Sequence, residues 1–106
     1  MSKKGSQNRV AVIYRIMDEW REHLSLLVVP GGYVLNQTRS EGSEQMLVYR
    51  SESFASGQGF WQAFDENAEY GGMEDDQLVM DCLDDIRSHS GKLASEIETE
   101  LRRRQE

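Results

Sequence analysis

Apolar residues near the start of the chain recur every three or four positions, at Val10, Ile13, Met17, Trp20, Leu24 and Leu27. Residues at this spacing share one face of an α-helix, because the helix turns once every 3.6 residues or so, about 100° per residue. Asn8 stands just before the stripe, where a side-chain oxygen can cap the first turn. The pattern predicts an amphipathic helix from Asn8, with Arg15, Asp18, Arg21 and Glu22 on its solvent-exposed face. Residues 1–7 are predicted to be a flexible tail. Residues 26–29 either extend this helix or begin a strand.

The middle of the chain predicts an antiparallel β-hairpin over about residues 33–50. Residues 33–38 and 45–50 carry Tyr, Val, Leu and Met, and residues 40–44 are rich in Ser, Gly and Glu. The length of the turn-like segment 40–44 predicts a hairpin loop of more than two residues. Before the hairpin, Pro30 presets the first position of a turn and Gly31 tolerates the positive φ of a type II turn.

The second half of the chain predicts helices separated by glycine and serine breaks. Residues 51–59 are a Ser- and Gly-rich loop, and Phe60, Trp61 and Phe64 indicate a short helix or turn that fixes this loop to the core. Residues 74–76 are acidic and precede a helix, because negative charge is favourable at a helix N-terminus. The buried face of that helix is predicted to hold Leu78, Val79, Cys82, Leu83 and Ile86.

A last helix is predicted from about Lys92. Its apolar stripe consists of Leu93, Ile97 and Leu101, and its glutamates and arginines are spaced for ion pairs one turn apart, Glu98 with Arg102 and Glu100 with Arg104. The stripe spans about two heptads, so it either docks on the core or forms a short seam with a second copy of the chain.

These elements together predict a single α+β domain over residues 8–106. In chain order it has an N-terminal amphipathic helix, the antiparallel hairpin, and two C-terminal helices packed on a small sheet. The residues expected in its core are Trp20, Leu35, Leu47, Phe54, Phe64 and Ile86.

Length and composition limit the class of protein. At 106 residues the chain has the size of one small domain. Its single cysteine excludes an internal disulfide and favours a reducing compartment. No apolar run approaches the roughly 20 residues of a membrane span, and no apolar segment follows the basic N-terminal residues as in a signal peptide. We therefore expect a cytoplasmic protein with no membrane partner.

The negative charge of the chain is concentrated in one segment. Residues 51–86 contain ten acidic residues and no lysine or arginine, whereas the whole chain carries −7, so the other residues sum to +3. The same segment holds all three phenylalanines, Trp61 and Tyr70. A local field of this kind acts on a partner more than on the fold. Carboxylates also disfavour direct binding to nucleic-acid phosphates or to an anionic membrane.

The chain has few residues suited to catalysis. Its two histidines, His23 and His89, lie in no catalytic motif, and Cys82 falls on an apolar helix face, where a thiol usually serves as a small core residue. One cysteine and two distant histidines do not supply a zinc site. We therefore predict no enzyme, no catalytic residue and no cofactor.

The acidic segment contains part of the pattern of a calcium-binding loop. Asp65, Asn67, Glu69 and Asp76 have the spacing of four ligand positions in an EF-hand loop. Tyr70, however, stands where that loop needs glycine for its sharp turn. We predict no bound metal.

The predicted function is binding to a basic protein surface. Three carboxylates between Asp81 and Asp85 lie within about 6 Å of helix rise, a charge density similar to that of duplex DNA, at about 1.7 Å per charge. Such a surface can imitate nucleic acid and occupy, and so inhibit, a nuclease, a guide-RNA effector or another nucleic-acid-binding protein, with aromatic side chains as anchors. The predicted partner-binding residues are Asp65, Glu66, Glu69, Glu74, Asp75, Asp76, Asp81, Asp84, Asp85, Trp61 and Tyr70.

Other functions fit the same features. An acidic surface can serve solubility alone, and a homodimer or other self-assembly stays open. In size and charge the chain resembles phage-encoded inhibitors of host defence, including anti-CRISPR proteins. In the same respects it is similar to acidic secretion chaperones and to immunity proteins that neutralise basic toxins, and no residue receives a role from these resemblances. A chaperone would be a dimer with an apolar groove, whereas a DNA mimic would bind in a strongly salt-dependent way.

Overall fold

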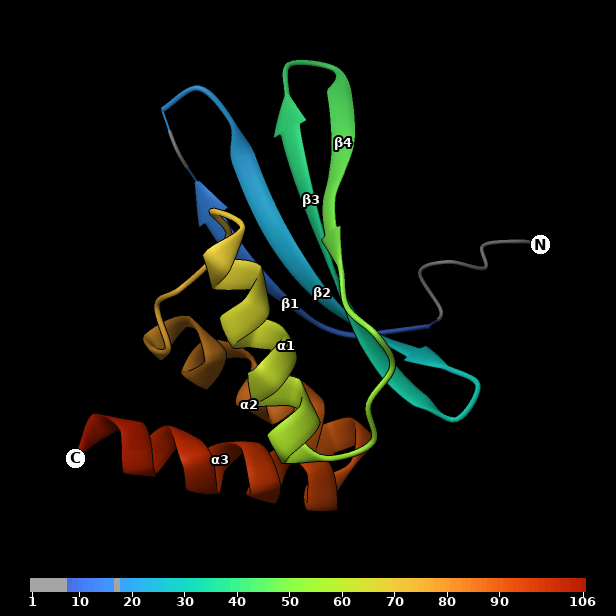
Figure 1. Ribbon diagram of the computed structural model, residues 1–106, viewed down its shortest axis with the longest axis vertical. Coiled ribbons are helices and arrows are strands. Elements are labelled where there is room, and N and C mark those ends of the chain that lie inside the picture. Colours follow the sequence, from blue (N-terminus) through green and yellow to red (C-terminus); the bar gives the residue numbers. More distant parts are fainter. Residues whose placement is uncertain (1–7, 17) are drawn as a thin grey trace.

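The computed structural model describes residues 8–16 and 18–106. They form a four-stranded antiparallel sheet followed by three helices, which confirms an α+β fold (Figure 1). The elements in chain order are β1 (Arg9–Ile16), β2 (Arg21–Val29), β3 (Gly32–Glu41), β4 (Glu44–Arg50), α1 (Gly57–Glu69), α2 (Gln77–His89) and α3 (Gly91–Gln105). Each strand pairs with its neighbour in sequence, so β1 and β4 are the edges of the sheet.

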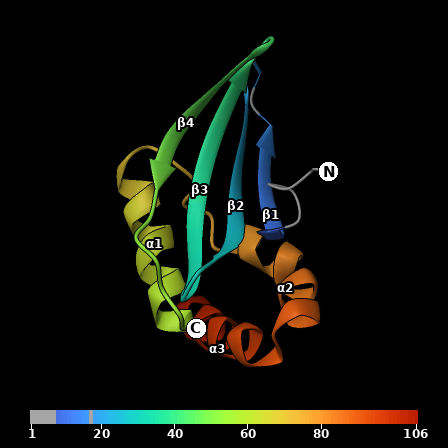
Figure 2. The same cartoon turned by 90° about the vertical axis from the view of Figure 1, so that its right-hand side faces the viewer.

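The three helices cover one face of the sheet. α1 contacts β3, α2 contacts β1, and α3 packs against both other helices (Figure 2). The end of the sheet that carries the β3–β4 turn extends beyond the helices (Figure 1). None of the helices in the described part of the chain is long and apolar enough to cross a membrane. The sheet residues that share one hydrophobic cluster with the helices are Ala11, Ile13, Leu24, Leu26, Leu35 and Tyr49.

The predicted N-terminal helix is wrong, because residues 9–16 and 21–29 form the antiparallel pair β1–β2. Apolar residues in this region are frequent enough to fit a helical and an alternating pattern at once. Alternation is the pattern that the fold uses: Leu24 and Leu26 face the helices and are buried, whereas His23, immediately before Leu24, lies on the other face. The β-branched residues of the segment also favour a strand. The predicted tail over residues 1–7 lies outside the described residues, as does Met17 of the stripe.

The predicted hairpin over residues 33–50 is confirmed as β3 and β4. Its loop is shorter than predicted, because Glu41 pairs with Glu44 and only Gly42 and Ser43 remain between them. Gly42 has a φ of 59°, which a type II′ turn requires at its first loop position. Glycine therefore permits a two-residue loop where the length of the polar segment suggested a longer one.

Two further features of this region follow the sequence pattern. The turn at Pro30 and Gly31 joins β2 to β3, and Gly31 adopts a φ of 88°. After β4, the Phe54 backbone N–H donates to the Tyr33 carbonyl at 2.8 Å, and the Tyr33 N–H donates back to the Phe54 carbonyl at 2.8 Å. The segment between β4 and α1 is therefore tied to the start of β3.

The two predicted C-terminal helices are confirmed as α2 and α3. The segment predicted as a loop over residues 51–59 and then a short helix or turn contains a third full helix, α1, which begins at Gly57. α1 has 13 residues and buries Phe60 and Phe64 among others. Serine caps two of the helices: the Ser56 side chain accepts from the Gly59 N–H in α1, and the Ser90 side chain accepts from the Leu93 N–H in α3. Of the predicted α2 face, Leu78 is half-buried and the fully buried members are Val79, Cys82, Leu83 and Ile86.

The predicted core is confirmed at three positions and wrong at one. Leu35 and Phe64 are 1% exposed and Ile86 is fully buried, whereas Trp20 and Phe54 are half-buried. Leu47 is 58% exposed. It pairs with Thr38 across β3 and β4, immediately beside a register shift, and its side chain lies on the face of the sheet away from the helices.

The apolar stripe of α3 docks on the core. Leu93, Ile97 and Leu101 are at most 3% exposed and belong to the same cluster as the sheet residues. The stripe therefore provides no seam for a second copy of the chain. The ion pairs predicted on this helix are confirmed: Glu98 contacts Arg102 at 2.9 Å and Glu100 contacts Arg104 at 3.0 Å.

Glu22, which the helix prediction placed in solvent, is buried in β2 and contacts one arginine on each neighbouring strand. Glu22 is fully buried, and it is the register partner of Arg15 in β1 and of Arg39 in β3. Its Oε1 accepts from Arg15 Nε at 3.0 Å and from Arg15 Nη2, and its Oε2 accepts from Arg39 at 3.1 Å (Nε) and 2.7 Å (Nη2). Burial raises the pKa of Glu22, but the hydrogen bonds and charges of the two arginines outweigh it and hold the pKa below its usual value.

This shift predicts a pH dependence of stability. Because the Glu22 pKa is lower in the folded chain, the unfolded chain binds the extra proton first as the pH falls. Its stabilisation is complete above the unfolded pKa of about 4.3 and is lost as the pH falls through the folded pKa. The difference in unfolding free energy between the wild type and Glu22→Gln should therefore shrink from about pH 6 to pH 3 in urea titrations. Subtracting the free energy of the variant from that of the wild type cancels the contribution of carboxylates common to both proteins. A difference that stayed constant over this range would show that the Glu22 pKa is not lowered by folding.

A second buried polar contact joins α1 to β3. Asn67 and Gln37 are both fully buried, and Asn67 Nδ2 donates to Gln37 Oε1. The Asn67 Oδ1 accepts from the Met73 N–H at 2.9 Å, and its backbone carbonyl accepts from the Gly72 N–H at 3.0 Å. The loop between α1 and α2 is thus fixed to the sheet rather than only tethered at its ends.

Candidate functional site

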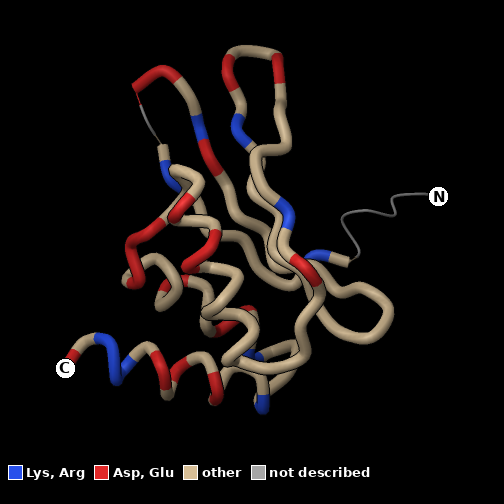
Figure 3. The backbone as a smooth tube through the Cα atoms, in the orientation of Figure 1, with Lys and Arg blue, Asp and Glu red and all other residues tan. Residues whose placement is uncertain are grey.

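The predicted partner-binding carboxylates lie on α1, on the loop that follows it, and on α2 (Figure 3). All are exposed except Asp76, which is half-buried. Two of these carboxylates, Asp65 and Asp76, form ion pairs with Arg104. The remaining carboxylates form two groups on the surface.

The first group, the α1 acidic group, consists of Glu66, Glu69, Glu74 and Asp75. No member forms a salt bridge within residues 8–16 and 18–106. The second, the α2 acidic group, consists of Asp81, Asp84 and Asp85. Only Asp84 in this group has a described cationic partner, Arg87 at 3.5 Å, and its side chain remains 98% exposed. Both groups can therefore present their charge to a partner.

Tyr70 lies within the α1 acidic group. It is the C-cap of α1, follows Glu69 directly and is 67% exposed. Its ring is 6.0 Å from that of Tyr49, which is buried in the sheet. The Tyr49 hydroxyl lies 3.0 Å from Glu66 Oε1 and 3.1 Å from the Ala63 carbonyl, so it can donate to either oxygen. Burial, and then Glu66, hold the pKa of Tyr49 above its usual value. The Tyr70 ring is therefore exposed to solvent and lies next to the buried ring of Tyr49.

Trp61, the other aromatic residue predicted to contact a partner, is buried. It is 3% exposed, and its indole N–H donates to the Ile97 carbonyl at 3.1 Å. Its ring packs edge-on against both Phe60 and Phe64. The exposure that the prediction required is absent, because α3 and the side chain of Arg104 cover the ring. Tyr70 is the member of the pair that a partner can reach directly.

Arg104 closes a cage of acidic and aromatic groups between α1 and α3. Its guanidinium carbon is 4.1 Å from the centre of the Trp61 ring. Its Nη1 and Nη2 donate to Asp65 at 3.0 and 2.6 Å, its Nε donates to Glu100 at 3.0 Å, and Asp76 lies at 3.3 Å. Hydrogen bonding, first to Asp65, raises the pKa of Arg104 further. Residues 51–86 contain no basic residue, but the fold brings Arg104 from α3 into contact with two of their carboxylates, Asp65 and Asp76.

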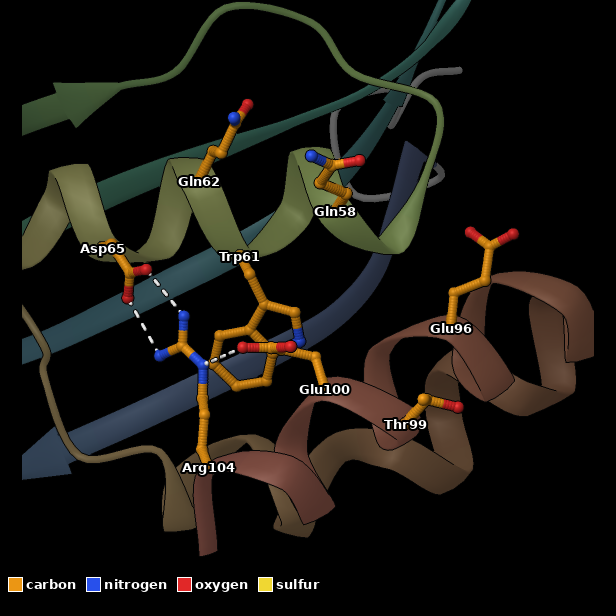
Figure 4. Close-up of a pocket in the computed structure, with 8 residues that line it drawn as sticks. All are labelled: Gln58, Trp61, Gln62, Asp65, Glu96, Thr99, Glu100 and Arg104. Carbon is orange, nitrogen blue, oxygen red and sulfur yellow. Dashed lines mark hydrogen bonds and ion pairs between the residues drawn. The ribbon is translucent and has the colours of Figure 1, made fainter.

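The cage opens into a groove of about 490 Å³ between α1 and α3 (Figure 4). Gln58 and Gln62 line it from α1, and Thr99 and Glu96 line it from α3. The Glu96 carboxylate accepts from the Gly57 N–H at 2.8 Å and so helps to cap α1. Hydrogen bonding, first from Arg103, lowers the pKa of Glu100 to about 2. The groove is therefore polar and acidic, with an aromatic ring beneath its resident cation.

The four residues with EF-hand spacing do not form a loop. Asp65, Asn67 and Glu69 lie on α1, where Asn67 points into the core, and Asp76 contacts Arg104. In the described part of the chain, no group of three or more His, Cys, Asp or Glu side chains is placed to hold a metal ion.

His23, Cys82 and His89 do not form a common site: His23 lies in β2, Cys82 in the middle of α2 and His89 at its end. Cys82 is buried in α2, and burial raises the pKa of its thiol to about 12. His89 lies 3.2 Å from the Tyr33 hydroxyl. Burial, and the nearby charge of Arg9, lower the pKa of His23. None of these side chains lines the groove between α1 and α3.

Comparisons with protein-family models, with curated proteins and with solved structures find no match to this chain. The described residues form an α+β protein with two exposed acidic groups, in which Asp84 is the one member with a described cationic partner. Tyr70 is exposed within the α1 acidic group, and Arg104 fills a cage between α1 and α3.

Proposed function

We propose that the protein binds a basic macromolecular surface through its two acidic groups, with Tyr70 as an anchor. The partner class that fits best is a protein that binds nucleic acid, such as a nuclease or a guide-RNA effector. Occupying the basic groove of such a protein would inhibit it. The observation that carries the proposal is the exposed Tyr70 ring among carboxylates that have no intramolecular counter-charge.

Charge explains how such a surface would find its partner. Unpaired carboxylates raise the encounter rate with a basic surface, and this steering falls as salt screens it. An aromatic side chain then supplies the buried contact that carries much of the affinity, since Tyr is among the common hot-spot residues. A partner arginine or lysine can also lie over the Tyr70 face as a cation–π pair.

Rigid support favours this function over a purely solubilising surface. Asn67 and Gln37 fix the loop that carries Glu74 and Asp75, and Tyr70 packs on Tyr49. A binding surface gains affinity when its groups are already ordered. Solubility requires charge without such order.

Charge reversal tests the proposal. In the α1 variant, Glu66, Glu69 and Glu74 become lysine, and in the α2 variant the three members of the α2 acidic group become lysine. Each raises the net charge from −7 to −1. We expect both to lose the nucleic-acid-binding proteins that the wild type captures from a cell lysate and releases at moderate salt. Tyr70→Ala should weaken the same binding at least about 30-fold, as expected for a hot spot worth about 2 kcal/mol or more.

A matched control separates a binding surface from net charge. Asp18, Glu19 and Glu41 are exposed, lie near the hairpin ends and can be reversed together for the same change in net charge. This variant should bind as the wild type does. Equal losses in all three reversal variants would indicate that net charge alone matters, and retained binding by folded α1 and α2 variants would refute the proposed surface.

A further inference from the structure

We propose that the cage around Trp61 is a binding site for an arginine side chain of the partner, and that Arg104 fills this site in the free protein. The identity of the partner rests on the proposed function above. The recognition chemistry of the cage does not, and a small ligand can test it alone.

The cage matches a guanidinium group on its face and on its edges. The Trp61 ring covers the flat face at 4.1 Å. Asp65 binds the two terminal nitrogens as a fork, and Glu100 binds Nε. Planar cations with five donors favour this combination of aromatic face and carboxylate fork, whereas an ammonium group uses neither fully. The groups come from α1 and α3, so the packing of the two helices, rather than a flexible loop, builds most of the site.

The cage is accessible from the groove shown in Figure 4. Gln58 and Gln62 line the groove from α1, and neither side chain forms a hydrogen bond with another described residue. Their amides can therefore pair with the backbone of a partner segment that brings an arginine to the cage. Such polar contacts fix the position of a ligand, while the Trp61 ring supplies the apolar surface.

Arg104 is the part of the site that can leave. It lies in the last turn of α3, which ends at Gln105, and helix ends open at a lower free-energy cost than helix bodies. Trp61 and Asp65 lie within α1 and stay in place. A tethered side chain acts at a high effective concentration. Free arginine should therefore not displace Arg104, whereas an arginine held within a larger interface can.

Removing Arg104 should leave an empty site with a strong preference for guanidinium. Asp65 and Asp76 would then lose their shared cation, while Glu100 would keep its contact with Arg103 at 2.6 Å. A diffusible guanidinium ligand would relieve the repulsion and cover the Trp61 ring. This predicts chemical rescue of Arg104→Ala by an arginine analogue.

The experiment titrates Arg104→Ala with N-acetyl-arginine amide and follows the indole N–H of Trp61 by ¹H–¹⁵N correlation spectra. We expect a saturable shift in the variant and none in the wild type, and the Trp20 indole, which is not in the cage, serves as an internal control. N-acetyl-lysine amide should bind at least about tenfold more weakly, because it lacks the planar fork. At a ligand concentration about nine times Kd, the folding equilibrium of the variant should rise about tenfold.

Further variants keep the proposal falsifiable. Adding Asp65→Asn to Arg104→Ala should abolish the shift, and Arg104→Gln replaces Arg104→Ala if the alanine variant does not fold. The proposal would be overturned if the Trp61 indole signal of a folded variant did not shift with the arginine analogue, or shifted equally with the lysine analogue. That result would leave the charge-reversal test unaffected, and a failure of charge reversal would leave the cage unaffected.

Discussion

Replacing Glu22 by alanine should lower the free energy of unfolding by about 3 kcal/mol, because it leaves two arginines facing each other across a buried carboxylate site. Glu22 is fully buried, while Arg15 and Arg39 are 32% and 29% exposed in their side chains. The arginines can turn partly toward water, which places the effect at the lower end of the range for a broken buried ion pair. For a domain of this size, such a loss corresponds to a fall in Tm of roughly 15 °C. Urea and thermal denaturation, followed by circular dichroism, measure both quantities.

Glu41→Ala is the matched control for this prediction. Glu41 is exposed and lies opposite Glu44 at the end of β3 and β4, so the substitution removes a like-charge contact instead of a pairing one. Its effect should stay within about 0.5 kcal/mol. If Glu22→Ala also stayed within that limit, the row of Arg15, Glu22 and Arg39 would not be a stabilising element of the sheet.

The same row explains why the sequence pattern predicted the first part of the fold wrongly. In the helix interpretation, Arg15 and Glu22 face water, and exposed charges are compatible with an amphipathic helix. In the sheet they lie opposite each other on the helix-facing side, and Glu22 also contacts Arg39, which is 17 residues away in the sequence. Periodicity within one segment carries no information on such cross-strand partners, whereas the Pro30–Gly31 turn is a local feature and was predicted correctly.

The helices were predicted better because their signals are local. Glycine or serine residues mark both ends of α1, the end of α2 and the start of α3, and the buried stripe of α3 has the expected members. The acidic segment is also visible in the sequence. Its partial neutralisation is not, because Arg104 reaches Asp65 from 39 residues away. For the same reason the sequence could not show that Trp61 is covered and that Tyr70 is exposed.

The position of Tyr70 and its acidic neighbours depends on one buried amide, and this leads to the second large effect. Replacing Asn67 by alanine should lower the free energy of unfolding by about 3 kcal/mol, because a buried donor or acceptor left unpaired costs about 1–3 kcal/mol. The substitution removes the acceptor of the Met73 N–H and the donor to Gln37 Oε1. Gly72 packs so closely on both amides that a Cβ there would collide with them, so other side chains have little room to compensate.

The Asn67 variant also separates structural support from binding. Hydrogen exchange at the Met73 amide should accelerate more than exchange in α3, since the loop loses its tie to the sheet while the helix packing remains. Gln62→Ala removes an exposed amide from the same helix and should change the unfolding free energy by less than about 0.5 kcal/mol. If Met73 exchanged at its wild-type rate in Asn67→Ala, the buried amide would not be what orders the loop. If the loop loosened and partner binding stayed at wild-type strength, preorganisation of the α1 acidic group would not contribute to the affinity, and the exposed charges alone would have to account for it.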